Sequence, residues 1–277
     1  GETYRPDFTF HGFRYMEITG LPKKPNARDF SGYPMRSDLQ TKGQFSSSND
    51  VLNRIQQLCI NTFLANVVTV QSDCPHRERF AYGGDIVATS DAFFMNFDMA
   101  GFYAKTVLDW ADSALPDGRL TDTAPFVGVD YCGVGWAKVH PLLLEQLHQY
   151  YGAYDFIKEQ LPVAMRWLDA EAARREKGLV VKGLGDHESL TDKEWGAKLT
   201  TPVFTDSARR IARLATIIEE PKVAERAQTY ADESQAAWEK EFLNPNTGVV
   251  AEGTQTAQAF ALGFADNNPE TQQRIFK

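Results

Sequence analysis

From residue 50 onward, segments of helical length follow one another through mostly short turns. In the first segment Val51, Ile55 and Leu58 fall on one face at helical spacing, and Asn49 is among the polar residues that could cap its start. The same pattern predicts helices over residues 50–67, 85–97, 100–114, 136–151, 154–176, 206–219, 221–241 and 254–265. Helices joined by short connections pack as antiparallel neighbours. The sequence therefore predicts a mainly α protein in which helix pairs build a toroid.

Three stretches depart from this pattern. Residues 1–22 alternate large apolar and polar side chains between proline and glycine residues, which is typical of β-strands. Residues 23–47 are polar and rich in Pro, Gly and Ser, so we expect a connector there. The pattern of residues 178–205 predicts a long irregular connection, and such connections are often functional or mobile.

We therefore expect three parts in the chain. Residues 1–22 would end a β domain that begins upstream, residues 23–47 would connect the two domains, and residues 48–277 would form the N-terminal part of the helical domain. The last predicted helix pair starts near residue 254 and has no closing element after it. We expect the toroid to be incomplete in this chain.

Composition argues against several classes of function. The chain has 277 residues and a formal net charge of −8 without basic runs, which argues against binding to a nucleic acid. No apolar stretch reaches the roughly 18 residues of a membrane-spanning helix, so we expect no membrane partner. The three cysteines form no CxxC pair, and no nucleotide-binding loop or other cofactor motif is found. We expect no disulfide framework, no zinc site and no cofactor.

One stretch concentrates chargeable groups: residues 73–85, DCPHRERFAYGGD. Glu78 and Asp85 flank Tyr82 and a Gly-Gly pair that would let the backbone approach a ligand closely. Two carboxyl groups beside an aromatic ring are suited to cleaving a sugar–oxygen bond. One protonates the leaving oxygen, and the other activates water or attacks the anomeric carbon. The more desolvated of the two carboxyl groups would stay protonated and act as the acid.

Two other interpretations of this stretch stay open. It could be a solvated cluster of ion pairs at the start of a helix, with Asp85 as the helix cap. It could also hold a metal ion through Asp73, His76 and Glu78. That close spacing is not a recurrent ligand pattern, and no second histidine is in register, so we expect no metal.

Other candidates carry weaker signals. Trp136 lies at a glycine-rich helix entry and could stack on a sugar or pack in the core. Asp186 and His187 lie in the long irregular connection, either at a binding edge or in a solvated turn. Arg77 could keep neighbouring carboxylates ionised.

Four motifs together resemble one family, the bacterial α-L-rhamnosidases of glycoside hydrolase family 78. The stretch DCPHRERFAYGGD resembles the family's DCP-Q/H-R-(D)-E-R…G-W/Y…G-D signature. TYRPDFTFHGFRYMEITG resembles the segment that leads from its β domain into its catalytic domain. GVGWAKVHPLLLEQLHQYYG resembles its GWGDA…P helix entry, and GVVAEGTQTAQAFALGF resembles its QT-x-x-A-x-A-L segment. The resemblance covers nearly the whole chain.

This resemblance implies an (α/α)6 toroid preceded by a β-sandwich-like domain. It implies an enzyme that hydrolyses terminal α-L-rhamnosyl residues from oligosaccharides, polysaccharides or glycosides with inversion of the anomeric centre. A bacterial protein in the periplasm or outside the cell is favoured over a cytoplasmic one, and the oligomeric state is left open. Glu78 matches the family's general acid, which has to remain protonated, so we expect Glu78 to be buried. We assign sugar binding to Asp73, Arg77, Tyr82, Asp85, Trp136, Asp186 and His187.

The sequence also departs from the family in two places. GWAKV replaces GWGDA, so the usual aspartate is missing at Ala137 or Lys138 and the pocket could suit another sugar. The family's general base is a glutamate well downstream of the QT segment, whereas Glu252 and Glu270 come too early. We expect the base to lie beyond residue 277. The alternatives are a hydrolase for another sugar on the same toroid and a helical domain that binds sugar without catalysis.

Overall fold

The computed structural model describes residues 2–187, 196–264 and 269–276. Most of this part is helical, which confirms the predicted mainly α class. The helices are α1 (Asp50–Ala65), α2 (Gly83–Asn96), α3 (Ala100–Asp112), α4 (Val134–Ala137), α5 (Val139–Tyr151), α6 (Tyr154–Ala172), α7 (Ala197–Ile217), α8 (Pro221–Phe242), α9 (Gln255–Phe264) and α10 (Pro269–Phe276). A 3-10 helix, η1 (Ala27–Asp29), and a small antiparallel hairpin of β1 (Val67–Val68) and β2 (Val70–Gln71) complete the regular elements of these residues.

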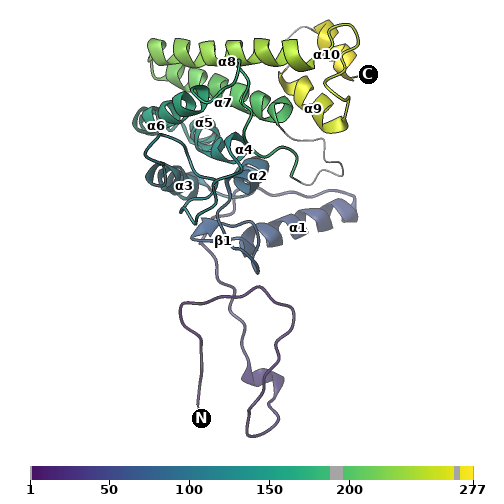
Figure 1. Cartoon of the computed structure of the whole chain (residues 1–277). Helices are drawn as coiled ribbons and strands as arrows, with labels where there is room; N and C mark the ends of the chain where they lie inside the picture. Colours follow the sequence, from purple (N-terminus) through teal and green to yellow (C-terminus); the bar gives the residue numbers. More distant parts are fainter. Residues whose placement is uncertain (1, 188–195, 265–268, 277) are drawn as a thin grey trace.

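The helices lie in two layers that alternate along the chain (Figure 1). In one layer α2 contacts α5, α5 contacts α7, and α7 contacts α9. The other layer contains α3, α6 and α8, and each of these packs on the first layer or on its neighbour. Large apolar side chains such as Trp110, Trp167 and Phe204 are fully buried in the core that the two layers share. Such an alternation of inner and outer helices is what a toroid of helix pairs requires.

Several helix ends follow from local sequence as predicted. The side chain of Asn49 accepts a hydrogen bond of 2.9 Å from the backbone N–H of Val51 and so caps α1. Pro221 opens α8, where its missing N–H has no helical partner to lose. Gly152 ends α5 in the left-handed conformation, with φ of 68°.

The structure differs from the sequence pattern at α7, which begins at Ala197 rather than at residue 206. Pro202 lies inside this helix and cannot donate the hydrogen bond that a helical residue gives to the carbonyl four positions earlier. That carbonyl, of Lys198, accepts a hydrogen bond of 2.8 Å from Trp238 Nε1 on α8. A tertiary contact therefore replaces the local bond that proline cannot make.

The strand prediction for residues 1–22 is wrong for the part that the structure describes. Residues 2–22 contain no strand (Figure 1). Nearly all of them are exposed. A strand needs a second strand to pair its N–H and C=O groups, and no strand of the described residues pairs with this segment. The chain joins the helical body at Ser37, whose backbone N–H donates to the Val67 carbonyl at 2.6 Å. The predicted domain boundaries at residues 22 and 47 stay predictions.

None of the helices in the described parts of the chain is both long and apolar enough to cross a bilayer.

Candidate active site

The charged stretch forms a loop that Asp73 closes. The backbone N–H of Asp73 donates to the Phe80 carbonyl at 3.0 Å, and the N–H of Phe80 donates to Asp73 Oδ1 at 2.8 Å. The other carboxylate oxygen of Asp73 accepts from the Cys74 thiol, with an Sγ–Oδ2 distance of 2.9 Å. Asp73 therefore holds the loop in shape, a role that its residue type alone did not indicate.

Glu78 lies in the exposed part of this loop. Its side chain is hydrogen-bonded to Tyr82. Burial raises the pKa of the Tyr82 phenol, and the hydrogen bond to Glu78 raises it further. The backbone of Tyr82 pairs with Thr123 in an antiparallel bridge, which fixes the position of the aromatic ring. The expectation that Glu78 is buried is wrong, because residues 76–79 are all exposed.

The carboxyl group that burial affects is that of Asp85, in the first turn of α2. Burial raises the pKa of Asp85, the nearby carboxylates of Asp73 and Glu78 raise it further, and the imidazole of His187 acts in the opposite direction. These four side chains therefore share one electrostatic environment. Asp85 does not cap α2, because the N-cap residue is Tyr82 and no side chain makes the cap hydrogen bond.

The Gly83-Gly84 pair lies against Trp136. A Cβ atom at Gly83 would overlap the Trp136 carbonyl, and one at Gly84 would overlap the indole ring itself. The backbone thus approaches a side chain of the protein here, and this contact corrects our expectation that the pair makes room for a ligand. The half-buried Trp136 ring meets the His187 ring edge-on, with 6.1 Å between centroids.

Asp122, which the sequence did not indicate, organises the loop in front of α4. Its buried carboxylate accepts three backbone hydrogen bonds, from the N–H groups of Tyr131 (2.6 Å), Cys132 (2.7 Å) and Gly133 (3.1 Å). On the far side of this loop, the N–H of Leu184 donates to the Cys132 carbonyl at 2.8 Å. Asp122 thereby connects the segment before Trp136 to the segment that contains Leu184 and His187. Its partners lie 9 to 11 residues away, so no short motif could reveal it.

The remaining predicted residues are less closely joined to the turn. Asp186 accepts a hydrogen bond of 2.8 Å from Thr256 Oγ1, which ties it to the start of α9. Arg77 is exposed and makes no hydrogen bond or ion pair with the residues that the structure describes. The structure thus brings together Asp73, Glu78, Tyr82, Asp85, Trp136 and His187, but not Arg77.

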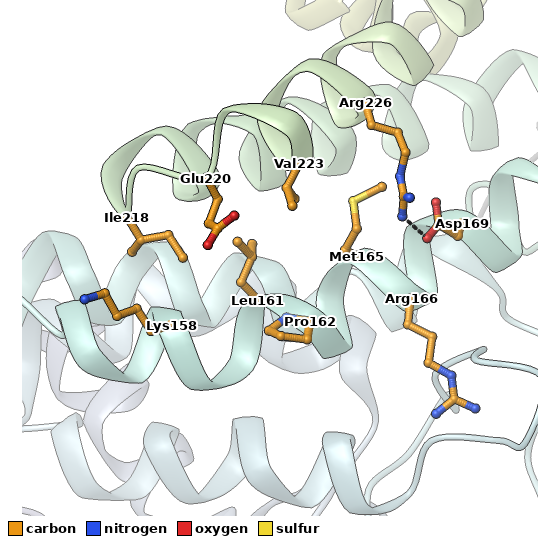
Figure 2. Close-up of a pocket in the computed structure, with 10 residues that line it drawn as sticks. All are labelled: Lys158, Leu161, Pro162, Met165, Arg166, Asp169, Ile218, Glu220, Val223 and Arg226. Atoms are coloured by element: carbon orange, nitrogen blue, oxygen red, sulfur yellow. Dashed lines mark hydrogen bonds and ion pairs between the residues drawn. The ribbon is translucent and has the colours of Figure 1, made fainter.

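A cavity of about 580 Å³ lies elsewhere, between α6 and α8 (Figure 2). Leu161, Met165 and Val223 line it with apolar surface, and the ion pair of Arg226 with Asp169 lies at one end. None of the predicted site residues lines this cavity. We assign the candidate site to the charged turn, because the carboxyl and aromatic groups that the chemistry requires gather there.

Comparison with known proteins gives two matches to family models. The model of the bacterial alpha-L-rhamnosidase 6 hairpin glycosidase domain matches residues 40–274. The model of the bacterial alpha-L-rhamnosidase concanavalin-like domain matches residues 1–36. An alpha-L-rhamnosidase of Streptomyces avermitilis is 31% identical over 270 residues, which are 95% of this chain and 26% of that protein.

Two solved structures share the fold closely. The alpha-L-rhamnosidase from Dictyoglumus thermophilum has a TM-score of 0.90 and 25% identity, over 99% of this chain and 32% of that one. The Streptomyces avermitilis alpha-L-rhamnosidase, complexed with L-rhamnose, has a TM-score of 0.90 and 28% identity, over 99% of this chain and 27% of that one. The six-hairpin match and these structures confirm the predicted α/α toroid. The chain spans 21% to 31% of the length of the curated relatives it matches.

Proposed function

Because the chain belongs to the bacterial α-L-rhamnosidase family, we propose that the protein hydrolyses terminal α-L-rhamnosyl residues with inversion of the anomeric centre. The observation that carries this proposal is the cluster at the charged turn. There Glu78 bonds to Tyr82, and the desolvated Asp85 lies near Asp73. A relative of the same fold, from Streptomyces avermitilis, was solved in complex with L-rhamnose, which supports a sugar ligand of this class.

In the proposed mechanism Glu78 protonates the glycosidic oxygen. The Tyr82 hydroxyl donates to the Glu78 carboxylate and orients it. Asp85 and Asp73 accept hydrogen bonds from the ring hydroxyls, since each oxygen of the Asp73 carboxylate can accept one bond more than it does within the loop. Trp136 presents its indole to the apolar face of the sugar. Arg77, Asp186 and His187 are proposed to complete the sugar contacts: Arg77 at the turn, Asp186 and His187 on the opposing segment.

Inverting hydrolysis needs a second carboxylate, which activates water on the opposite face of the sugar. We propose that a glutamate outside these 277 residues supplies it. Glu252 pairs with Lys198 at 2.7 Å and Glu270 with Arg274 at 3.7 Å, so both carboxylates are engaged in ion pairs. This assignment agrees with the absence of a matching motif around either residue.

The replacement of the family's GWGDA motif by GWAKV bears on which sugar the site accepts. Ala137 is buried, and the Lys138 ammonium lies 4.0 Å from Asp206 on α7, where burial lowers the pKa of Lys138. The substituted positions therefore take part in the packing of α4 and α5 on α7. The departure therefore gives no reason to propose a sugar other than rhamnose.

The test is hydrolysis by the complete natural polypeptide that carries this chain. We expect a rhamnose-terminated disaccharide to be cleaved, with the inverted anomer appearing first by NMR. Glu78→Gln should abolish cleavage of the disaccharide, a loss of at least about 100-fold, but spare part of the activity on a rhamnoside with an activated aryl leaving group, which needs little protonation.

Asp85→Asn is the matched comparison, because Asp85 is the more buried carboxyl. If Asp85→Asn, and not Glu78→Gln, shows the leaving-group dependence, the acid is Asp85. If the wild type binds rhamnose without turnover, the helical domain is a sugar-binding module. Turnover of a different glycoside alone would indicate another substrate.

A periplasmic or extracellular location is part of the same proposal, since polysaccharides and plant-type glycosides reach bacteria from outside. Fractionation of cells that express the natural polypeptide would test it.

A further inference from the structure

Glu78 lies on a loop whose two ends are fixed and whose middle is exposed. Asp73 and Phe80 close the loop through the hydrogen bonds described above. Residues 76–79 between them are exposed, and the side chain of Glu78 bonds to Tyr82. The position of the Glu78 carboxyl therefore depends on what holds the middle of this loop.

Arg79, the next residue, is held by the N-terminal segment. Its Nη1 donates a hydrogen bond of 2.8 Å to the Phe10 carbonyl, and its guanidinium carbon lies 5.1 Å from the centroid of the Phe10 ring. One guanidinium thus makes a hydrogen bond and a cation–π contact with the same residue. A lysine could not reproduce both contacts, because its ammonium is a compact charge without the planar fork.

Gly12 makes a second contact with the same loop. A Cβ atom at Gly12 would lie 3.1 Å from the Pro75 carbonyl oxygen and 3.2 Å from the His76 Cβ. Residues 10–12 therefore touch the loop near its beginning, at Pro75, and near its end, at Arg79. Glu78 lies between these two contacts.

The backbone of Arg79 also requires support from its surroundings. Its φ is 56°, in the left-handed region that residues other than glycine rarely adopt. Such a conformation persists where other contacts hold it. A relaxation of Arg79 would rotate the peptide that joins it to Glu78 and move the carboxyl.

We infer that Arg79 is a positioning residue: by fastening the loop to residues 10–12, it holds the Glu78 carboxyl in place to protonate the leaving oxygen. The inference rests on the proposed function. It also makes the acid's geometry depend on the segment that matches the concanavalin-like domain, so that two parts of the polypeptide build one site.

The test compares Arg79→Ala, Arg79→Lys and Phe10→Leu in the complete natural polypeptide, with Arg14→Ala as the control. Arg14 is an exposed arginine on the same N-terminal segment. We expect Arg79→Ala to lower kcat about 100-fold for a rhamnosyl disaccharide and to change KM little, because a misplaced acid harms the transition state rather than binding. With an activated aryl rhamnoside the loss should nearly vanish.

Arg79→Lys should recover only part of the activity, and Phe10→Leu, which keeps the carbonyl, should show a smaller loss in the same direction. Equal losses on both substrates would overturn the positioning role and indicate general unfolding, which a lowered Tm would reveal. If the wild type is active and Arg79→Ala behaves like Arg14→Ala, the inference alone is wrong. A wild type inactive on both rhamnosides would overturn the proposed function and, with it, the role of Arg79.

Discussion

Gly84 and Gly101 occupy the same position in two helices, the second residue of α2 and of α3, but their surroundings differ. A Cβ atom at Gly101 would have no heavy atom within 4 Å, whereas at Gly84 it would overlap the Trp136 ring. One hydrogen atom in place of a methyl group therefore allows the indole to lie directly against the start of α2. The observed position of the Trp136 ring in the site therefore requires glycine at residue 84.

We predict opposite effects for the two alanine substitutions. Gly101→Ala should raise the free energy of unfolding by about 0.5–1 kcal/mol, because alanine is the better helix former. Gly84→Ala should lower it by about 1–3 kcal/mol through overpacking and shift the tryptophan fluorescence as Trp136 moves. Urea denaturation would measure both. A stabilised Gly84→Ala with unchanged fluorescence would contradict the packing described for Trp136.

Asp122 acts on the scale of an element, the loop that leads into α4. Its two carboxylate oxygens share three backbone N–H donors from Tyr131, Cys132 and Gly133. Gly133 also pairs with Gly183 in an antiparallel bridge, so the loop is held from both sides. The direction in which Trp136 projects is set by this loop and not by α4 alone.

An amide cannot replace this carboxylate, because its NH2 group would face backbone donors. We predict that Asp122→Asn lowers the free energy of unfolding by about 3 kcal/mol. It should also weaken rhamnose binding as the loop loosens. The control is Asp112→Asn, at an exposed residue of α3, which should change stability by less than about 0.5 kcal/mol. Chemical denaturation and calorimetric titration with L-rhamnose would measure the two effects, and equal behaviour of both variants would refute the role of Asp122.

For the whole molecule, a buried histidine between two helices links stability to pH. His140 on α5 is fully buried, and its Nε2 lies 3.4 Å from Gln160 Oε1 on α6. Burial lowers the pKa of His140 from 6.5 to about 4. The unfolded chain therefore takes up this proton at a higher pH than the folded protein, and stability falls as the pH drops from 6.5 toward 4.

The loss from His140 should total about 3 kcal/mol. Asp85 and Glu171, whose pKa burial raises, contribute with the opposite sign in acid, so the variant must be compared with the wild type. We predict that His140→Leu removes this part of the pH slope, whereas His11→Gln, at an exposed histidine, keeps it. Denaturation curves between pH 7 and 4 would show the difference, and parallel slopes for His140→Leu and wild type would contradict the prediction.

Most helices could be predicted from the sequence, because apolar periodicity and end signals such as Asn49 and Gly152 act within a few residues. The sequence also indicated the turn that gathers Glu78, Tyr82 and Asp85, since these residues are close along the chain.

The other features depend on the tertiary structure. It placed the start of α7 nine residues early, through the contact of Trp238 with Lys198 40 residues away. It left Asp85 half-buried and Glu78 exposed, and it placed the Asp122 carboxylate against the backbone of Cys132, ten residues further along the chain. Burial, space for a side chain and long-range hydrogen bonds depend on which segments meet, and no local pattern records that.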